Sequence, residues 1–281
     1  MIKILNECAK VKSYIFIPLA ICTLGSVAAC STVNTTAKAP VQSGSIAYSM
    51  AGKTLPLVVF QSGHGDGKDS WAPIFTKIAE SNKVFAYDRP GYGDSPVMSS
   101  PRDPCEITEE LRNVLRAAGA EPPYILVGHS LGGLYQFVYA KLYPGEVAGL
   151  VLLDPTHPDH WIRMQQDAPI AAAVLKTLHA TIFTSTMRRE FDDMNNCLEQ
   201  LDMSTPLDKP VRILTKTKFE LLELGAFETM VHALEDDWRR LSGTSMIKHV
   251  AGSGHYIHQD RPDVVIREIN SLVSETQNGT P

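Results

Sequence analysis

Short apolar runs bounded by turn residues alternate with stretches of helical periodicity along most of the chain. The apolar runs predict β-strands at residues 55–60, 84–87, 124–127, 147–153, 211–214 and 246–250. Apolar residues spaced by three and four positions predict helices at residues 70–79, 104–118 and 263–273. Because the predicted strands are apolar throughout rather than alternating, we expect an α/β fold with a mostly parallel sheet covered by helices on both faces.

Residues 155–209 interrupt this alternation because they contain no strand pattern. A helix is predicted at residues 168–183. An apolar stripe at alternating spacings of four and three residues then predicts a second helix; its members are Met187, Phe191, Met194, Leu198 and Leu201. Packing onto the main domain is the simplest interpretation of this stripe. An insertion of this size above a parallel sheet is also well placed to form a helical cap, and we predict one at about 155–209.

The N-terminal residues have the pattern of an export signal. Lysines precede an apolar run at residues 14–29, which is shorter than the roughly 20 residues that a membrane span needs. Val27-Ala28-Ala29-Cys30 resembles the lipobox of bacterial lipoproteins, whose cysteine is lipidated and becomes the new N-terminus. We therefore predict a signal peptide at residues 1–29, a lipid anchor on Cys30, a polar tether at residues 30–42, and a bacterial cell-envelope protein held on a membrane. A plain signal peptide with an incidental cysteine and an uncleaved anchor are the alternatives.

The composition is that of an ordinary globular protein. The 281 residues are 44% hydrophobic and 20% charged, which suffices for one domain with a sizeable core. The formal net charge of −5 argues against nucleic acid as a partner. Cys105 and Cys197 follow the predicted signal, and outside the cytoplasm they could form a disulfide or remain buried thiols. No cofactor motif is present, and the sequence does not indicate an oligomeric state.

A glycine-flanked serine stands between a predicted strand and a predicted helix. It lies in Gly128-His129-Ser130-Leu131-Gly132, directly after the apolar run at 124–127. A nucleophilic serine on a sharp strand-to-helix turn needs small neighbours, because larger side chains would block the close packing of that turn. Ser130 is therefore the candidate nucleophile. The alternative is a small residue in a tight connection without catalysis.

A nucleophilic serine also needs a base, an acid that orients this base, and backbone donors for the oxyanion. His255 is the candidate base because it follows the glycine-rich residues 252–254, in a loop after the last predicted strand. His258 lacks this glycine-rich approach, and His249 lies within the strand pattern, which favours a structural role.

A metal is not predicted. His157 and His160 are spaced like a pair of metal ligands, but no third ligand is apparent in the sequence. A surface loop is therefore the better interpretation of these two histidines.

Four segments of the chain resemble those of a known family, the α/β-hydrolase fold family. They are QSGHGDGKDSW (61–71), YDRPGYGDS (87–95), GHSLGG (128–133) and GSGHYIHQDRPD (252–263), in the family's order and at its spacing. The resemblance implies a hydrolase domain at residues 43–281. It also implies that the backbone N–H groups of His64 and Leu131 form an oxyanion hole. Ser62-Gly63 stands where many members have His-Gly, which leaves the backbone donors unchanged.

The acid is where the sequence departs from the family's commonest pattern. Many relatives carry the acid after the strand that here is 211–214, but the next residues, TKTKF, include no Asp. Asp154 ends the preceding predicted strand, at a position that some relatives use instead, and it is the first candidate. A turn residue before Pro155 is the alternative role for Asp154. Glu220 is the second candidate for the acid, although it and Glu223 have the pattern of a following helix.

The resemblance implies an acyl-transfer enzyme without a cofactor. A serine nucleophile excludes the haloalkane dehalogenase and epoxide hydrolase reactions of this fold, which use an Asp at that position. We expect a carboxylic-ester hydrolase with a small-molecule acyl substrate. Amide, lactone or thioester hydrolysis would use the same machinery, and an inactive fold that serves as a binding module is the alternative from a different class.

Overall fold

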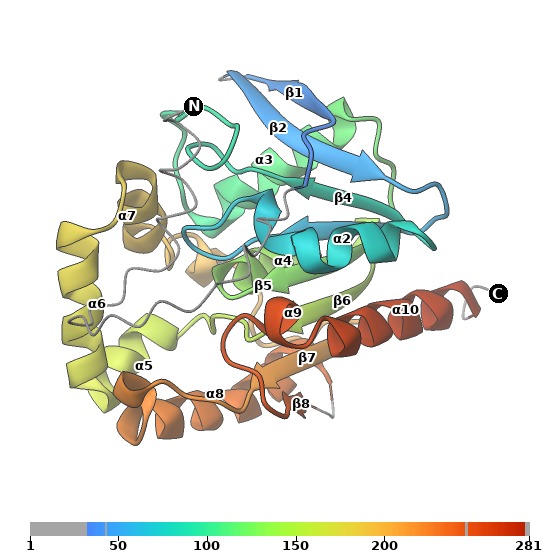
Figure 1. The fold of residues 1–281 in the computed structure, drawn as a ribbon. Helices are drawn as coiled ribbons and strands as arrows, with labels where there is room; N and C mark the ends of the chain where they lie inside the picture. The colour runs from blue at the N-terminus through green and yellow to red at the C-terminus, as the bar shows by residue number, and fades with distance from the viewer. Residues whose placement is uncertain (1–32, 43, 245–246, 279–281) are drawn as a thin grey trace, which may run out of the picture. The chain divides into compact units, whose positions relative to one another are not determined.

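A mostly parallel sheet forms the centre of the protein, as the sequence predicts. The structure is a computed structural model that describes residues 33–42, 44–244 and 247–278. Within these residues the sheet has eight strands in the order β1-β2-β4-β3-β5-β6-β7-β8 (Figure 1). The strands β3 to β8 are parallel, whereas β1 and β2 are antiparallel to their neighbours. Their bounds are Ala37–Val41, Gly44–Ala51, Leu57–Gln61, Lys83–Tyr87, Tyr124–His129, Val147–Leu153, Val211–Lys216 and Ile247–Val250.

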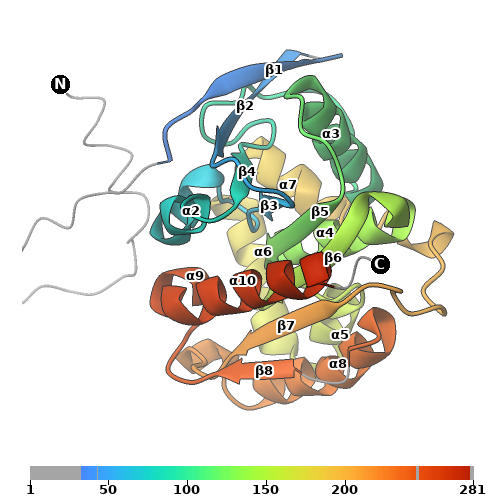
Figure 2. The same cartoon turned by 90° about the vertical axis from the view of Figure 1, so that its right-hand side faces the viewer.

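Helices cover both faces of this sheet. One face packs against α3 (Pro104–Ala117), α4 (Leu131–Leu142) and α8 (Ala226–Ser242), in an apolar layer that includes Leu126 of β5. The other face packs against α2 (Ala72–Ala79), α9 (Ile257–Asp260) and α10 (Pro262–Asn278), in a layer that includes Val127 (Figure 2). Successive residues of a strand point to opposite faces of the sheet. Because helices cover both faces here, the residues that point to either face must be apolar. This explains the continuous apolar runs in the sequence.

The start of the domain differs from the prediction. Residues 37–41, which were expected to belong to a tether, form β1 and pair with β2. Val33 is buried, and its N–H donates a hydrogen bond to Asp69 Oδ1 at 2.8 Å. The sequence AKAPV conceals this strand because alanine, lysine and proline are uncommon in strands, although an edge strand tolerates a proline such as Pro40. The compact unit therefore begins at Val33.

The predicted signal peptide and Cys30 lie outside the described residues. Among the helices of the described part of the chain, none is both long and apolar enough to cross a membrane.

The segment between β6 and β7 is helical, as predicted, but the helix predicted along the apolar stripe is shorter than expected. It contains α5 (His160–Asp167), α6 (Pro169–Thr181), α7 (Ser185–Asp192) and the 3-10 helix η4 (Leu198–Gln200). The prediction of one helix along the stripe from Met187 to Leu201 is wrong beyond Asp192. The chain turns there, and Cys197 has a left-handed φ of 67°. Met194 and Leu198 nevertheless pack against α4, because apolar spacing records burial even where the helix is interrupted.

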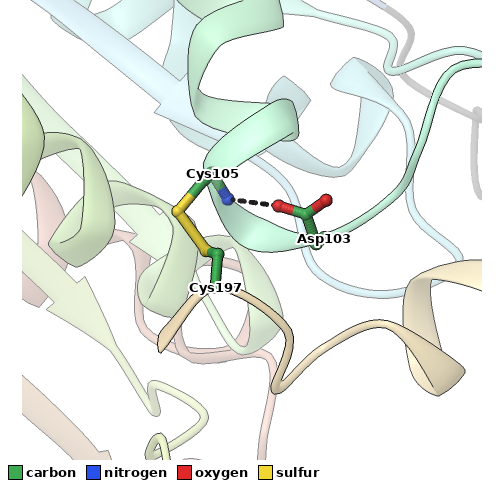
Figure 3. A group of neighbouring side chains, drawn as sticks. All are labelled: Asp103, Cys105 and Cys197. Carbon is green, nitrogen blue, oxygen red and sulfur yellow. Dashed lines mark hydrogen bonds between the residues drawn. A yellow bond between two sulfur atoms is a disulfide. The ribbon is translucent and has the colours of Figure 1, made fainter. Parts of the chain in front are cut away.

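A disulfide fastens this helical segment to the main domain. Cys105, at the start of α3, and Cys197 are bonded to each other, with their Cα atoms 6.3 Å apart (Figure 3). Asp103 caps α3 by accepting a hydrogen bond from the N–H of Cys105 at 3.0 Å. The sequence allowed either a disulfide or two buried thiols at Cys105 and Cys197, and the structure has the disulfide.

Candidate active site

Ser130 occupies the turn between β5 and α4 in a backbone conformation that few residues adopt. Its φ and ψ are 53° and −123°. In the described part of the chain, the non-glycine residues with positive φ are Ser130, Asp154 and Cys197. Such backbone strain persists where the surroundings hold it, and it concentrates at functional sites. Here the N–H of Ser130 donates to the carbonyl of Leu153 at 3.0 Å, which ties the turn to the end of β6.

The glycines that flank Ser130 are required by the close approach of neighbouring backbone. A Cβ atom on Gly128 would lie 2.7 Å from the Cα of Gly133, and one on Gly132 would lie 2.2 Å from the carbonyl oxygen of Gln61. Both distances are too short for non-bonded atoms. Gly132 therefore lets α4 begin against the end of β3, and the prediction that these glycines serve the packing of the turn is confirmed.

Asp154 and His255 lie side by side although they are 101 residues apart in the sequence. His255 Nδ1 and Asp154 Oδ2 are 2.6 Å apart, which fits a hydrogen bond from the imidazole N–H to the carboxylate. Burial by itself raises the pKa of Asp154, but the hydrogen bond and charge of His255 and the charge of Lys216 outweigh this effect. The pKa of Asp154 therefore lies below its ordinary value, and the carboxylate is ionised.

The other candidate acids have different partners. Glu220 caps the 3-10 helix η5 (Leu221–Glu223), where Glu220 and Glu223 each accept a hydrogen bond from the backbone N–H of the other. Glu223 also accepts a hydrogen bond from the buried Lys216 Nζ at 2.7 Å. Lys216 Nζ is 3.9 Å from Asp154 Oδ2, so this lysine is a second positive neighbour of the Asp154 carboxylate.

His129 is a residue of this site that the sequence analysis did not single out. Its Nε2 donates a hydrogen bond to the carbonyl oxygen of His255 at 2.9 Å, and the two ring centroids are 4.6 Å apart. Burial and the charges of His255 and His258 hold the pKa of His129 well below its ordinary value. The neutral ring therefore supports the loop that carries His255. Its position next to Ser130 was the signal available in the sequence.

The remaining candidate histidines have other surroundings. His258 is fully buried against Trp71, with ring centroids 4.5 Å apart, and burial lowers the pKa of His258 to about 3. His157 is buried and its Nε2 is 2.9 Å from Asp237 Oδ2, so the interpretation as a surface loop is wrong for this residue. Burial and the charge of His157 lower the pKa of His160 to about 4.

The loop after β3 passes directly beside Ser130. A Cβ atom on Gly63 would lie 3.2 Å from the Cβ of Ser130, so the residue before His64 borders the candidate nucleophile. Leu131 is the first residue of α4, and N–H groups in the first turn of a helix have no partner within the helix. Both proposed oxyanion donors therefore belong to segments that border Ser130.

Side chains from the loop after β4 hold the loop after β3 in place. Asp88 Oδ1 accepts a hydrogen bond from the N–H of Lys68 at 2.7 Å. Arg89 donates from Nη1 to the carbonyl of Ser62 at 2.6 Å and from Nη2 to the carbonyl of Gly63 at 2.8 Å. The side chains of the segment YDRPGYGDS thus hold the backbone around His64 in position by hydrogen bonds.

Glu190 of α7 connects the inserted helices to Arg89, which holds the loop after β3. Its side chain is fully buried and accepts hydrogen bonds from Arg89, Arg102 and Tyr92. Burial favours the protonated acid, but the two guanidinium groups dominate and lower the pKa of Glu190 to about 2. The carboxylate is therefore ionised and compensates the buried charge of Arg89, since an unpaired buried ion is costly.

A second contact from α7 reaches the same loop. His64 Nε2 lies 2.8 Å from the carbonyl oxygen of Met187 and its ring packs against Phe183, with centroids 4.6 Å apart. Burial lowers the pKa of His64, so its side chain is neutral and donates to that carbonyl. The side chain of His64 thus faces the inserted helices.

Asp66 adds a carboxyl group close to Ser130. A Cβ atom on Gly63 would lie 3.5 Å from Asp66 Oδ2 and 3.2 Å from the Cβ of Ser130. Burial raises the pKa of Asp66 above its ordinary value, against the opposing charges of Arg89 and His255. The sequence analysis did not identify Asp66, because nothing in the local pattern distinguishes it from a polar loop residue.

The strained Ser130, the paired Asp154 and His255, and the loop after β3 all follow the carboxyl ends of parallel strands, where α/β folds commonly place their functional sites. The chain belongs to the alpha/beta hydrolase fold family, whose sequence profile matches residues 56–207. This confirms both the resemblance and the fold class.

Similar proteins agree with this assignment. The protein YqjL of Bacillus subtilis (strain 168) is 27% identical over 210 residues, which are 74% of this chain and 79% of YqjL. The epoxide hydrolase CorEH has a TM-score of 0.65 and 18% identity, over 85% of this chain and 98% of CorEH. A thermophilic esterase from Thermogutta terrifontis has a TM-score of 0.61 and 18% identity, over 87% of this chain and 98% of the esterase. At such low identity the two structures establish the fold alone.

Proposed function

We propose that the protein is a serine hydrolase that cleaves carboxylic esters through an acyl-enzyme on Ser130. The observation that carries this proposal is the pairing of His255 with Asp154 at 2.6 Å, at the same edge of the sheet as the strained Ser130. The nucleophile itself argues against the chemistry named for CorEH. Attack of a serine hydroxyl on an epoxide would give an ether, which water does not readily hydrolyse, whereas attack on an ester gives an acyl-enzyme that water releases. The likeness to an esterase is consistent with this choice.

In this proposal His255 donates its Nδ1–H to Asp154, which leaves the lone pair on Nε2 free to accept a proton. Ser130 Oγ attacks the carbonyl carbon of the ester while its proton passes to His255 Nε2. The backbone N–H groups of His64 and Leu131 stabilise the oxyanion. The imidazolium then protonates the leaving alkoxide, and water, activated by the same histidine, releases the acid from Ser130.

The surroundings of the triad support this chemistry. The negative charge of Asp154 stabilises the imidazolium form of His255 in the transition state, and the hydrogen bond from His129 to the carbonyl of His255 limits movement of its loop. Arg89 holds the carbonyl groups of the loop after β3, so that the N–H of His64 is positioned before substrate binds.

The proposed location is the bacterial cell envelope, with a lipid on Cys30 that holds the domain on a membrane. The lipobox-like sequence before Cys30 supports this proposal. The disulfide between Cys105 and Cys197 is consistent with it, because disulfides form and persist in oxidising compartments.

Labelling with a fluorophosphonate probe, followed by mass spectrometry of the labelled peptide, tests the nucleophile. We expect the label on Ser130 and none in Ser130→Ala. Turnover of nitrophenyl esters of increasing chain length, beside an amide, a lactone and a thioester, then identifies the substrate class. Ser130→Ala and His255→Ala should each lose several orders of magnitude in kcat, and the double variant should be little worse. Normal turnover in either single variant would reject the proposal.

A further inference from the structure

Glu235 of α8 is a buried carboxylate whose partners are two histidines. Its side chain is 8% exposed, whereas those of His232 and His249 are each 46% exposed. In the described part of the chain, no lysine or arginine forms an ion pair with Glu235. A buried carboxylate needs a compensating positive charge. A bound cation would supply this charge.

The three side chains place their ligand atoms close to one another. His249 Nε2 is 2.9 Å from Glu235 Oε2, and His232 Nδ1 is 3.4 Å from Glu235 Oε1. All three ligand atoms lie within 4.8 Å of one another. Ligands of a tetrahedral zinc ion, at about 2.0–2.1 Å from the metal, are separated by roughly 3.3 Å. Small movements of the half-exposed imidazoles would therefore place all three atoms around one ion.

We propose that His232, Glu235 and His249 form a site for zinc or a similar divalent transition-metal ion. Two imidazoles and a carboxylate are a ligand set that zinc uses in proteins, with water in the fourth position. The exposure of both histidines leaves room for this water on the solvent side. The site is separate from the proposed triad and does not depend on the proposed hydrolase activity.

The position of the site in the fold indicates what the ion would do. His232 and Glu235 lie on α8, and His249 lies on β8, which is the edge strand of the sheet and pairs with β7 on one side. Few hydrogen bonds hold a short edge strand, so a metal that bridges β8 to α8 would stabilise it. The loop that carries His255 follows directly after β8. Metal binding is therefore expected to stabilise the base of that loop.

Two other groups of potential ligands in the described residues are less suited to a metal. In the group of His157, Asp159 and Asp237, both ring nitrogens of His157 already have partners. Its Nδ1 accepts a hydrogen bond from the N–H of Asp159 at 3.0 Å, so the neutral ring carries its proton on Nε2. This is the nitrogen that faces Asp237 at 2.9 Å and would have to bind the metal. In the group of Asp103, Cys105 and Cys197, the two sulfur atoms are bonded to each other.

Calorimetric titration with Zn²⁺ tests the site. The full-length protein is made without a histidine tag and is treated with EDTA beforehand. We expect one binding event that is weakened at least about tenfold in His249→Gln, His232→Gln and Glu235→Gln. Asp159→Asn, from the group with occupied nitrogens, is the matched control and should bind like the wild type. Zn²⁺ should also raise the melting temperature of the wild type and of Asp159→Asn, but not of His249→Gln.

Three results would overturn the proposal. One is a wild-type protein that shows no binding of Zn²⁺. Another is binding that persists unchanged in all three variants. The third is binding that is lost in Asp159→Asn. Because ester turnover is not measured, failure here is distinguishable from failure of the proposed function. His249→Gln checked by circular dichroism separates loss of a ligand from loss of the fold.

Discussion

Arg89 and Glu190 form a two-point ion pair inside the protein, with Arg89 Nε 2.9 Å from Glu190 Oε1 and Nη2 3.1 Å from Oε2. The two residues are 101 positions apart and belong to the loop after β4 and to helix α7. Because Arg89 also holds the carbonyl groups of Ser62 and Gly63, Glu190 is a positioning residue for the loop that carries His64. The inserted helices thus reach the proposed oxyanion hole through this carboxylate, in addition to the contact between His64 and Met187.

Glu190→Gln should therefore lower both stability and activity. The amide keeps the shape of the side chain but leaves the buried Arg89 without a countercharge, at a cost of about 3–5 kcal/mol. We expect kcat to fall at least about tenfold with little change in KM, because loss of oxyanion stabilisation acts on the transition state. Denaturant unfolding and ester kinetics, both well below the melting temperature, measure the two effects.

Glu80→Gln is the control for Glu190→Gln. It removes an ion pair on the surface, in which the side chains of Glu80 and Lys77 are 60% and 62% exposed. It should therefore change stability by less than about 1 kcal/mol. An unchanged kcat in Glu190→Gln would show that the pair holds the fold and does not position the loop.

Asp154→Asn should reduce kcat by roughly 10³–10⁴, because an amide at this position favours the wrong tautomer of His255. Glu220→Gln should leave kcat nearly unchanged, since Glu220 caps η5, whereas the Nδ1 of His255 pairs with Asp154. Steady-state kinetics on one water-soluble ester compares the two variants. A reversed order would assign the role of the acid to Glu220.

The unfolding free energy should decrease as the pH falls from about 6.5 towards 4.5. Burial lowers the pKa of His258 to about 3 and that of His160 to about 4, so both rings stay neutral in the folded protein. The unfolded chain takes up these protons below about pH 6.5, and each such proton lowers stability by up to about 1.4 kcal/mol per pH unit. Urea unfolding at several pH values should give a shallower slope for His258→Gln than for the wild type. Equal slopes would mean that His258 does not take up a proton on unfolding.

Cys30→Ser should abolish the incorporation of labelled acyl chains in a bacterial host and release the protein from the membrane fraction. The hydrolase domain begins at Val33, so turnover of a water-soluble ester should be unchanged. Mass spectrometry of the mature wild-type N-terminus provides the direct measurement. A mature protein that begins elsewhere, or that carries no acyl chain, would contradict the lipid anchor and leave the catalytic proposal intact.

The sequence alone determined the features that depend on neighbouring residues. Strands buried on both faces must be apolar at every position, and for this reason β3, β5, β6 and β7 were predictable. The turn at Ser130 needs glycines at fixed offsets, because backbone passes within van der Waals distance of them, and this made it recognisable. The glycine-rich residues 252–254 made His255 recognisable for another reason, since Gly252 has a left-handed φ of 77° and no atom would contact a Cβ there within 4 Å.

Only the tertiary structure decided the features that depend on strand order and on distant contacts. Asp154 and Glu220 are both acidic residues near strand ends, and the geometry of β6 and β7 brings the first to His255. Glu190 is one acidic residue beside the predicted apolar stripe, and its complete burial depends on two arginines from other segments of the chain. Strand β1 consists mostly of residue types that are uncommon in strands, and its pairing with β2 was therefore invisible in the sequence. A local pattern records burial and turn geometry, whereas the compensation of a buried charge depends on which distant side chain the fold brings to it.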